Sequence, residues 1–116
     1  MESTIALVQG LYFLFTGVWP LISMRTFLMV TGAKTDLWLV KTVGVILAVI
    51  GAVLLYARAT VTINSPVIAL ALGAGMGLAV VEIVYVMKRV ISPIYLGDAA
   101  AEILLAIWWG IALLSS

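Results

Sequence analysis

The 116-residue chain is 66% hydrophobic and only 9% charged, and its net charge is +1. A water-soluble domain of this size needs far more charge to cover its surface, so the composition excludes a soluble domain and indicates an integral membrane protein whose partner is the lipid bilayer. The chain has no Cys and no His, which excludes disulfides, thiol nucleophiles and the usual zinc and haem sites. We therefore expect no cofactor, no metal and, without any basic run, no nucleic-acid partner.

Four hydrophobic stretches fill nearly the whole chain. A bilayer core about 30 Å thick takes roughly 20 helical residues per crossing. The stretches at residues 5–23, 37–56, 66–87 and 93–114 have this length. They predict an all-α polytopic membrane protein with four transmembrane helices in an antiparallel bundle, which makes residues 1–116 a single domain. The first stretch lacks a basic leader and a cleavage pattern, so we interpret it as a retained helix rather than a signal peptide.

Two of the predicted spans begin with the same signal. Ser65 is followed by Pro66, and Ser92 is followed by Pro93. Serine is a common N-cap, and proline suits the first helical position because its missing N–H has no partner there. The polar run TGAKTD at residues 31–36 separates the first two spans.

Basic residues are distributed unevenly between the two ends of the predicted spans. Only Arg58 lies near the second loop, whereas five basic residues lie in or beside the first and third loops. The positive-inside rule places these two loops in the cytoplasm. It therefore predicts a multi-pass protein of the bacterial inner (plasma) membrane with both termini on the non-cytoplasmic side. The five basic residues are Arg25, Lys34, Lys41, Lys88 and Arg89.

Each predicted span has one face that is polar, small or aromatic when its residues are placed 100° apart. Such faces are typical of a bundle interior. In chain order, the four faces consist of Gln9, Tyr12, Thr16, Trp19 and Ser23; of Trp38, Lys41, Gly44, Ala48, Ala52 and Tyr56; of Ala71, Gly75, Leu78, Ala79, Glu82 and Tyr85; and of Tyr95, Asp98, Glu102, Leu105 and Trp109.

Four ionisable residues lie on these interior faces at similar depth. At 1.5 Å per residue, Lys41, Glu82 and Asp98 are each about 8–9 Å from the cytoplasmic edge. Glu102 is one turn deeper, close to the middle of the membrane. The pattern predicts that all four converge on a pocket that is open toward the cytoplasm.

Ionisable groups inside a membrane span require a reason, because each costs at least about 2.5–3.5 kcal/mol on insertion scales. One explanation is a buried salt bridge between Lys41 and either Glu82 or Asp98 that only fixes the register of the bundle. The other starts from the surplus of acid over base, which indicates a proton carrier or a cationic ligand. Trp38 and Tyr95 share faces with Lys41 and Asp98, and they could belong either to the interfacial aromatic belt or to the pocket wall.

Our leading hypothesis is a pocket that binds or transports a small cationic or amphiphilic ligand, with a proton carried by Glu102 or Glu82 in one version. The alternative is a non-catalytic accessory subunit of a membrane complex, in which the buried charges serve only packing. An enzyme ranks third, because no nucleophile accompanies the paired carboxylates. The candidate ligand-binding or proton-carrying residues are Thr16, Trp38, Lys41, Glu82, Tyr85, Tyr95, Asp98 and Glu102.

A row of small residues on the third span indicates an association surface. Ala69, Gly73 and Gly77 lie opposite Glu82, and such rows commonly mark close helix contact. A homo-oligomer would bury this row against a second copy of the chain. A bend in the helix, or packing within the bundle, would explain it equally well.

Two segments resemble a known pattern. The runs TGAKTDLWLVKTVG (residues 31–44) and ISPIYLGDAAAE (residues 91–102) resemble those of a family of small four-span bacterial membrane proteins without an assigned function. The resemblance covers nearly the whole chain, and it implies a fold but no active site. Small multidrug transporters fit less well, because the first span here offers only Gln9 and Thr16 where they have a glutamate. The Gly-Arg pattern and the polar Asn of four-span fluoride channels are also missing.

Overall fold

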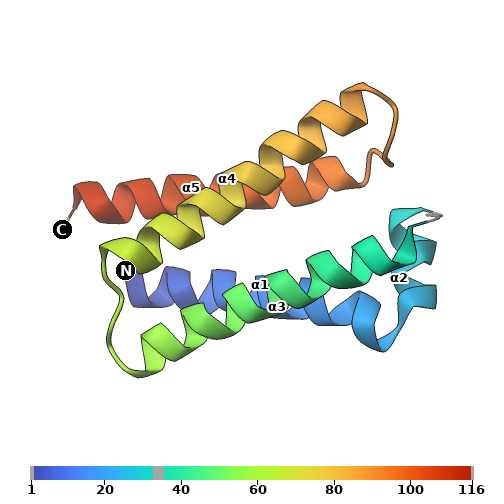
Figure 1. Ribbon diagram of the computed structural model, residues 1–116. Helices are drawn as coiled ribbons and strands as arrows, with labels where there is room; N and C mark the ends of the chain where they lie inside the picture. The colour runs from blue at the N-terminus through green and yellow to red at the C-terminus, as the bar shows by residue number, and fades with distance from the viewer. Residues whose placement is uncertain (1, 33–35, 116) are drawn as a thin grey trace.

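The computed structural model describes residues 2–32 and 36–115, and within them it contains helices and no strands. Four helices are long and apolar enough to cross a membrane, which confirms the prediction of an all-helical chain with four such segments. A fifth, shorter helix was not among the predicted spans. The helices are α1 (Glu2–Ile22), α2 (Met24–Thr31), α3 (Leu37–Ala59), α4 (Ser65–Met87) and α5 (Tyr95–Leu114) (Figure 1).

The starts of α4 and α5 differ slightly from the prediction. At α4 the cap is Asn64 rather than Ser65, because the Asn64 side chain accepts a hydrogen bond from the backbone N–H of Val67 at 3.3 Å. Ser65 is already the first helical residue. At α5 the hydroxyl of Ser92 accepts the N–H of Ile94 at 3.4 Å. A turn therefore precedes the helix, which begins two residues after the predicted start.

The short helix α2 folds back against the end of α1. The indole Nε1–H of Trp19 donates to the hydroxyl of Thr26 at 2.9 Å. The rings of Trp19 and Phe27 meet edge to face with their centroids 5.4 Å apart, an arrangement that aromatic pairs favour. These contacts hold α2 across the end of the helices that lies opposite the termini (Figure 1).

Glycines bring α1 and α3 into backbone contact. Gly10 and Gly17 on α1 face Gly51 and Gly44 on α3, and in each helix the two glycines are seven residues apart. A Cβ atom added at Gly51 would lie 2.6 Å from the carbonyl oxygen of Gly10, and one at Gly44 would lie 2.6 Å from that of Gly17. Only glycine permits such a close approach. The paired glycines therefore determine which face of α3 points inward.

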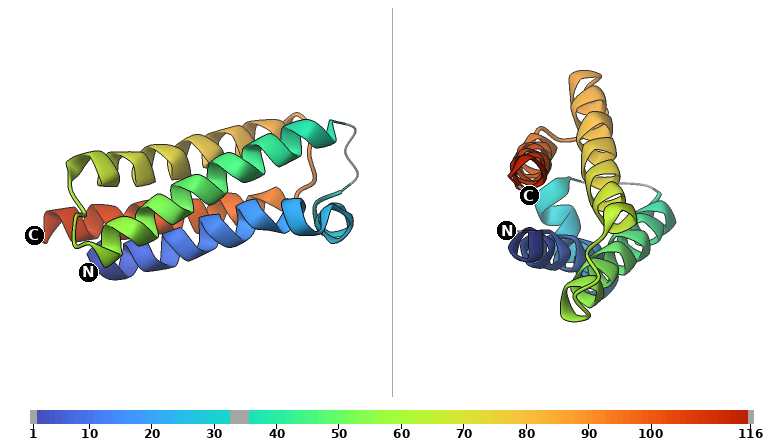
Figure 2. Two further views of the ribbon diagram at one scale, coloured as in Figure 1. Left: turned by 60° about the horizontal axis from the view of Figure 1, so that its bottom comes forward. Right: turned by 90° about the vertical axis from the view of Figure 1, so that its left-hand side faces the viewer.

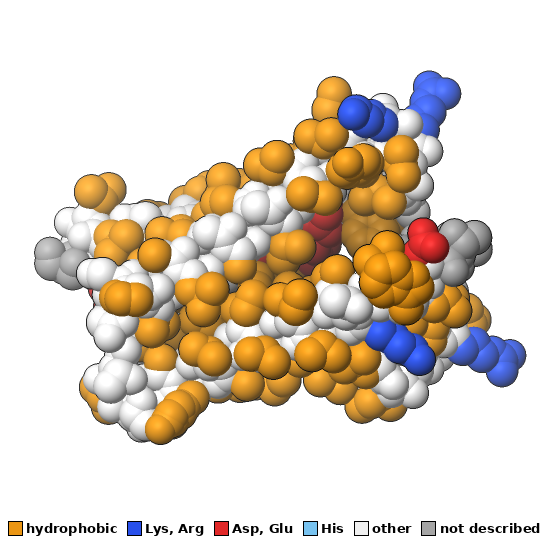
Figure 3. Space-filling view, in the orientation of Figure 1, with side chains coloured by type: hydrophobic (Ala, Val, Ile, Leu, Met, Phe, Trp, Pro, Cys, Tyr) orange, Lys and Arg blue, Asp and Glu red, His pale blue; other side chains and the backbone are white. Residues whose placement is uncertain are grey.

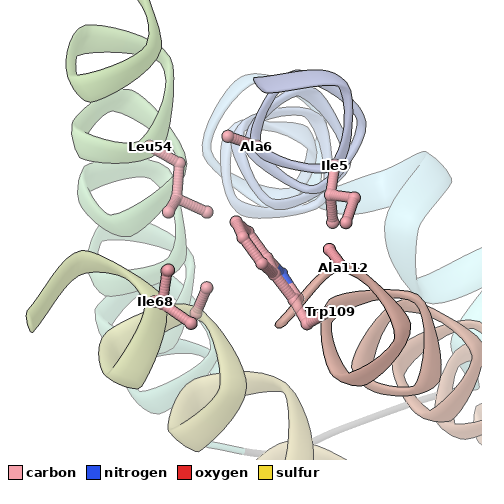
Figure 4. Close-up of a cluster of buried hydrophobic side chains, with 7 residues drawn as sticks. Ile5, Ala6, Leu54, Ile68, Trp109 and Ala112 are labelled. Carbon is pink, nitrogen blue, oxygen red and sulfur yellow. The ribbon is translucent and has the colours of Figure 1, made fainter. Parts of the chain in front are cut away.

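The four long helices form two pairs that face each other. Helix α1 packs mainly on α3, and α4 packs mainly on α5 (Figure 2). Both termini lie at the same end of the molecule (Figure 1). Near that end, Trp109 points from α5 into an apolar cluster shared by the two pairs (Figure 4). The cluster consists of Ile5, Ala6, Leu54, Ile68, Ala71, Trp109 and Ala112.

Candidate functional site

A cavity of about 500 Å³ lies between the two helix pairs, in the half of the molecule away from the termini. Its walls come from all five helices and are almost entirely apolar. Acidic side chains are visible at the floor of a hollow between α3 and α4 (Figure 3). Cavities that hold small ligands have volumes in this range, typically about 300–1,000 Å³.

Three carboxyl groups face this cavity. Glu82 comes from α4, and Asp98 and Glu102 come from successive turns of α5. Only 7% of Glu82 and 2% of Glu102 is exposed. Oε1 of Glu82 and Oε2 of Glu102 are fully buried and have no hydrogen-bond partner among the described residues. Buried oxygens of this kind normally have a partner, because leaving one unpaired costs about 1–3 kcal/mol.

The three carboxyls form one cluster around Tyr12. The phenol hydroxyl of Tyr12 donates a hydrogen bond to Oδ1 of Asp98. Glu82 lies within hydrogen-bonding reach of Asp98, and all three acids are close enough to Tyr12 to interact with it electrostatically. Tyr12 on α1 thereby connects the first helix pair with the acids of the second. Like charges this close in an apolar site cannot all be ionised unless a cation or shared protons compensate them.

Gln9 joins the two helix pairs on the side of the acid cluster that is nearer the termini. Its side chain is 1% exposed. Its Nε2 donates to the backbone oxygen of Ala71 on α4 at 2.9 Å, and its Oε1 accepts from the indole Nε1–H of Trp109 on α5 at 2.6 Å. One side chain of α1 thus holds both helices of the other pair. The acids lie between these hydrogen bonds and the end of the molecule at which α2 lies.

Gly75 on α4 provides the space that the carboxyl of Glu102 occupies. A Cβ atom at position 75 would lie 3.0 Å from Oε2 of Glu102 and 3.6 Å from Nε2 of Gln9. Any larger residue would therefore displace the carboxyl or the Gln9 amide. The predicted interior face of the third span included Gly75, but only its contact with Glu102 shows why the residue is small.

The structure brings five of the eight predicted site residues to the cavity and leaves three outside it. Trp38 is 67% exposed and Tyr85 is 42% exposed, and neither lines the cavity. The ring of Tyr85 instead has the ammonium group of Lys88 5.7 Å from its centroid. The five residues at the cavity are Thr16, Glu82, Tyr95, Asp98 and Glu102.

Lys41 also lies on the exposed side of α3 and does not line the cavity. The structure therefore does not bring Lys41 to the cavity that Glu82 and Asp98 line. The cause is the rotation of α3, because the contacts of Gly44 and Gly51 with α1 turn Lys41 outward. Among the described residues that line the cavity there is no Lys or Arg. The proposed salt bridge with Lys41 consequently has no geometric support, and the acids face the cavity without a basic partner among the described residues.

Tyr12 and Gln9 were placed on the interior face of the first span by the sequence, but neither was assigned to the site. Together with Thr16 they form a row of polar residues along α1, at spacings of three and four. Such a row in an otherwise apolar span was the feature of the sequence that could have assigned Tyr12 and Gln9 to the site. Their partners could not be identified from the sequence, because both bind residues more than 60 positions away.

Comparison of the chain with known protein families, with curated proteins and with solved structures finds no match. The site is therefore interpreted from its own geometry.

Proposed function

We propose that the protein is a multi-pass protein of the bacterial inner membrane whose four long helices form an antiparallel bundle around a ligand pocket. The pocket binds or transports a small lipophilic cation. One observation carries this proposal: Glu82 and Glu102 line an apolar cavity that no described Lys or Arg lines, and each has a buried carboxyl oxygen without a hydrogen-bond partner among the described residues. A cation with an apolar body complements both features of such a site.

The competing explanation is a buried salt bridge that serves only packing. This explanation requires a basic residue beside the acids. Lys41 was the one base expected at this depth, and it is exposed on α3. Three carboxyls without a basic partner among the described residues would be a costly way to stabilise a bundle, because isolated buried charges destabilise folded proteins. The cluster is better explained as a site that exchanges its counter-charge, with protons in one state and a cationic ligand in the other.

The cavity walls suit the apolar body of such a ligand. Aromatic residues including Phe13, Trp19 and Tyr95 line the cavity together with aliphatic side chains. Aromatic faces attract cations, and they do so more strongly when water is excluded. A strongly hydrated inorganic cation would find few oxygen ligands here beyond the three carboxyls.

Isothermal titration of the purified protein in neutral detergent tests this proposal. The probes are dodecyltrimethylammonium, an uncharged dodecyl maltoside and the anion dodecyl sulfate, all at concentrations below those that unfold the protein. We expect saturable binding of the ammonium compound alone, weakening as the pH falls and protons compete for the carboxyls. Equal binding of all three probes would show that the cavity only accepts apolar chains.

The orientation in the membrane makes a separate prediction. With five basic residues at one end of the spans and Arg58 at the other, both termini are expected in the periplasm. Alkaline phosphatase fused to either terminus should then be active, and green fluorescent protein fused there should be dark. The reverse pattern would place the acid cluster near the opposite membrane surface.

One observation supports a second function, association with another transmembrane helix. Gly73 and Gly77 lie on an exposed face of α4, Ala69 is exposed as well, and a Cβ added at either glycine meets nothing within 4 Å among the described residues. An exposed small row of this kind suits close contact with another transmembrane helix, as in an accessory subunit or a homo-oligomer.

The variant Gly73→Leu tests this contact. It should dissociate an oligomer without unfolding the monomer, because the leucine prevents close helix approach while its Cβ lies more than 4 Å from the described residues packed around it. Size-exclusion chromatography with light scattering gives the readout. A wild type that is monomeric both in mild detergent and in lipid nanodiscs would rule the contact out.

A further inference from the structure

The cavity has an opening on the side of the molecule, between α3 and α4. Val43 on α3 and Val81 on α4 both line the cavity, yet they are 46% and 52% exposed. Val43 and Val81 thus lie where the cavity meets the outer surface of α3 and α4. Figure 3 shows the hollow from this side, with acidic side chains visible at its floor. We call this opening the α3–α4 seam; its residues are Leu39, Val43, Leu47, Leu78 and Val81.

The seam exists because, among the described residues, α1 is hydrogen-bonded to the opposite helix pair, whereas α3 is not. Helix α1 contacts α5 and α4 through the hydrogen bonds of Tyr12 and Gln9. No comparable bond joins α3 to α4 in the described part of the chain, and these two helices pack only loosely. Their separation increases toward the end where α2 lies (Figure 1).

All the seam residues are apolar aliphatic side chains. A water-filled entrance for a charged ligand would have polar groups along its walls, whereas an entrance from the lipid needs none. In the proposed orientation in the bilayer, the seam faces acyl chains. The opening is thus suited to a molecule that already lies in the membrane with an apolar chain.

Charge at the end of the molecule also disfavours entry from water. Four basic residues are exposed: Arg25, Lys41, Lys88 and Arg89. Figure 3 shows Lys and Arg side chains at the end of the molecule away from the termini. Positive charges around an aqueous mouth reduce the local concentration of cations. A cation that is anchored in the bilayer by its tail reaches the acids without crossing this region.

We infer that the ligand is a cationic amphiphile, with an amine or quaternary ammonium head and one apolar chain, which enters from the bilayer through the α3–α4 seam and places its head at Glu82, Asp98 and Glu102. This inference rests on the proposed function, and it adds the chemical class of the ligand and its route. The head lies against the acids while the chain occupies the seam or remains in the lipid.

Bulky residues in the seam test the route. Val43→Phe and Val81→Phe narrow the opening, and Val45→Phe and Val80→Phe are matched controls, because these valines are 49% and 56% exposed but do not line the cavity. The protein is placed in phosphatidylcholine nanodiscs, and association of dodecyltrimethylammonium is followed by stopped-flow tryptophan fluorescence. We expect association to be at least about tenfold slower in the seam variants than in the controls.

The outcomes separate the route from the function. If the seam variants bind at the control rate while Glu102→Gln abolishes binding, the carboxyl site is right and lateral entry is wrong. If tetramethylammonium, which has the same head without a chain, binds as tightly as dodecyltrimethylammonium, the amphiphile class is wrong. If the wild type binds neither cation, the proposed function and this inference both fail.

A spectroscopic measurement covers the case in which the phenylalanine variants misfold. The chain has no cysteine, so a nitroxide attached to Val81→Cys reports on this position alone. Lipid-soluble oxygen should relax its electron paramagnetic resonance signal strongly, and a water-soluble nickel complex should do so weakly. Stronger relaxation by the nickel complex would show a water-filled opening and overturn lateral entry.

Discussion

Adding one methyl group at Gly51 is expected to destabilise the protein by roughly 1–3 kcal/mol, the usual cost of overpacking a tight core. In Gly51→Ala the new Cβ would lie 2.6 Å from both the carbonyl oxygen of Gly10 and the backbone nitrogen of Leu14. These are main-chain atoms, so no side-chain rotation relieves the contact and α1 must move away from α3. A thermal melt in detergent, followed by circular dichroism, should show a clearly lower midpoint.

Gly110→Ala is the matched control for this variant. Gly110 also lies within a long helix, but a Cβ there would meet nothing within 4 Å. Alanine favours helix over glycine by up to about 1 kcal/mol, so this variant should melt at the wild-type temperature or slightly above it. Equal destabilisation by both variants would mean that α1 and α3 do not meet at their glycines.

Replacing Glu102 with glutamine is expected to abolish cation binding while leaving the fold intact. Removing one partner of a buried charge pair costs roughly 3–5 kcal/mol, which corresponds to at least about 100-fold weaker binding of dodecyltrimethylammonium. The amide has nearly the shape of a protonated carboxyl and fits the space beside Gly75, so the ligand-free protein should melt close to the wild type. Titration calorimetry and thermal melts measure the two effects separately.

Asp36→Asn is the control for Glu102→Gln. Asp36 is exposed before α3 and does not line the cavity, so its neutralisation changes the net charge equally without touching the site. Unchanged binding in this variant and loss in Glu102→Gln together support the cluster. A large loss of stability in Glu102→Gln would instead mean that Glu102 is the ionised partner of a structural pair.

The interior faces of α4 and α5 could be predicted from the sequence, because the acidic residues within each helix lie on one face. Glu82 with Ala71, Gly75 and Ala79 identified the buried face of α4, and all four are buried. On α5 the acids and Trp109 lie opposite a continuous aliphatic face that includes Ile107 and Ile111, both exposed. Where only one face of a helix is suited to lipid, the periodicity of the sequence is sufficient to predict which face points inward.

The rotation of α3 could not be predicted in the same way. Lys41 was taken to point inward because a charge in a span usually does. A lysine near a helix end can, however, extend its charged group toward the membrane surface. The spacing of Gly44 and Gly51, which matches that of Gly10 and Gly17, was the better guide to the contact face. This guide is found only when the glycine spacings of two helices are compared with each other. Examining the faces of each helix alone does not reveal it.

The outward position of Lys41 also changes the expected effect of Asp98→Asn on stability. The sequence indicates Lys41 as a partner of either Glu82 or Asp98, so Asp98→Asn would leave Lys41 with fewer partners and destabilise the protein. The structure shows Tyr12 as the hydrogen-bond donor to Asp98. A hydroxyl can also donate to the amide oxygen of asparagine, so the structure gives no reason for a large loss of stability in this variant.

The most direct test of the carboxyl site is a crystal structure of the protein with dodecyltrimethylarsonium, in which arsenic replaces the ammonium nitrogen. Anomalous scattering locates the arsenic independently of the rest of the density. The proposal predicts one peak in the cavity beside Glu82, Asp98 and Glu102, with the alkyl chain directed toward the α3–α4 seam. A closed cavity without arsenic, in which Lys41 or another base pairs with the acids, would contradict it.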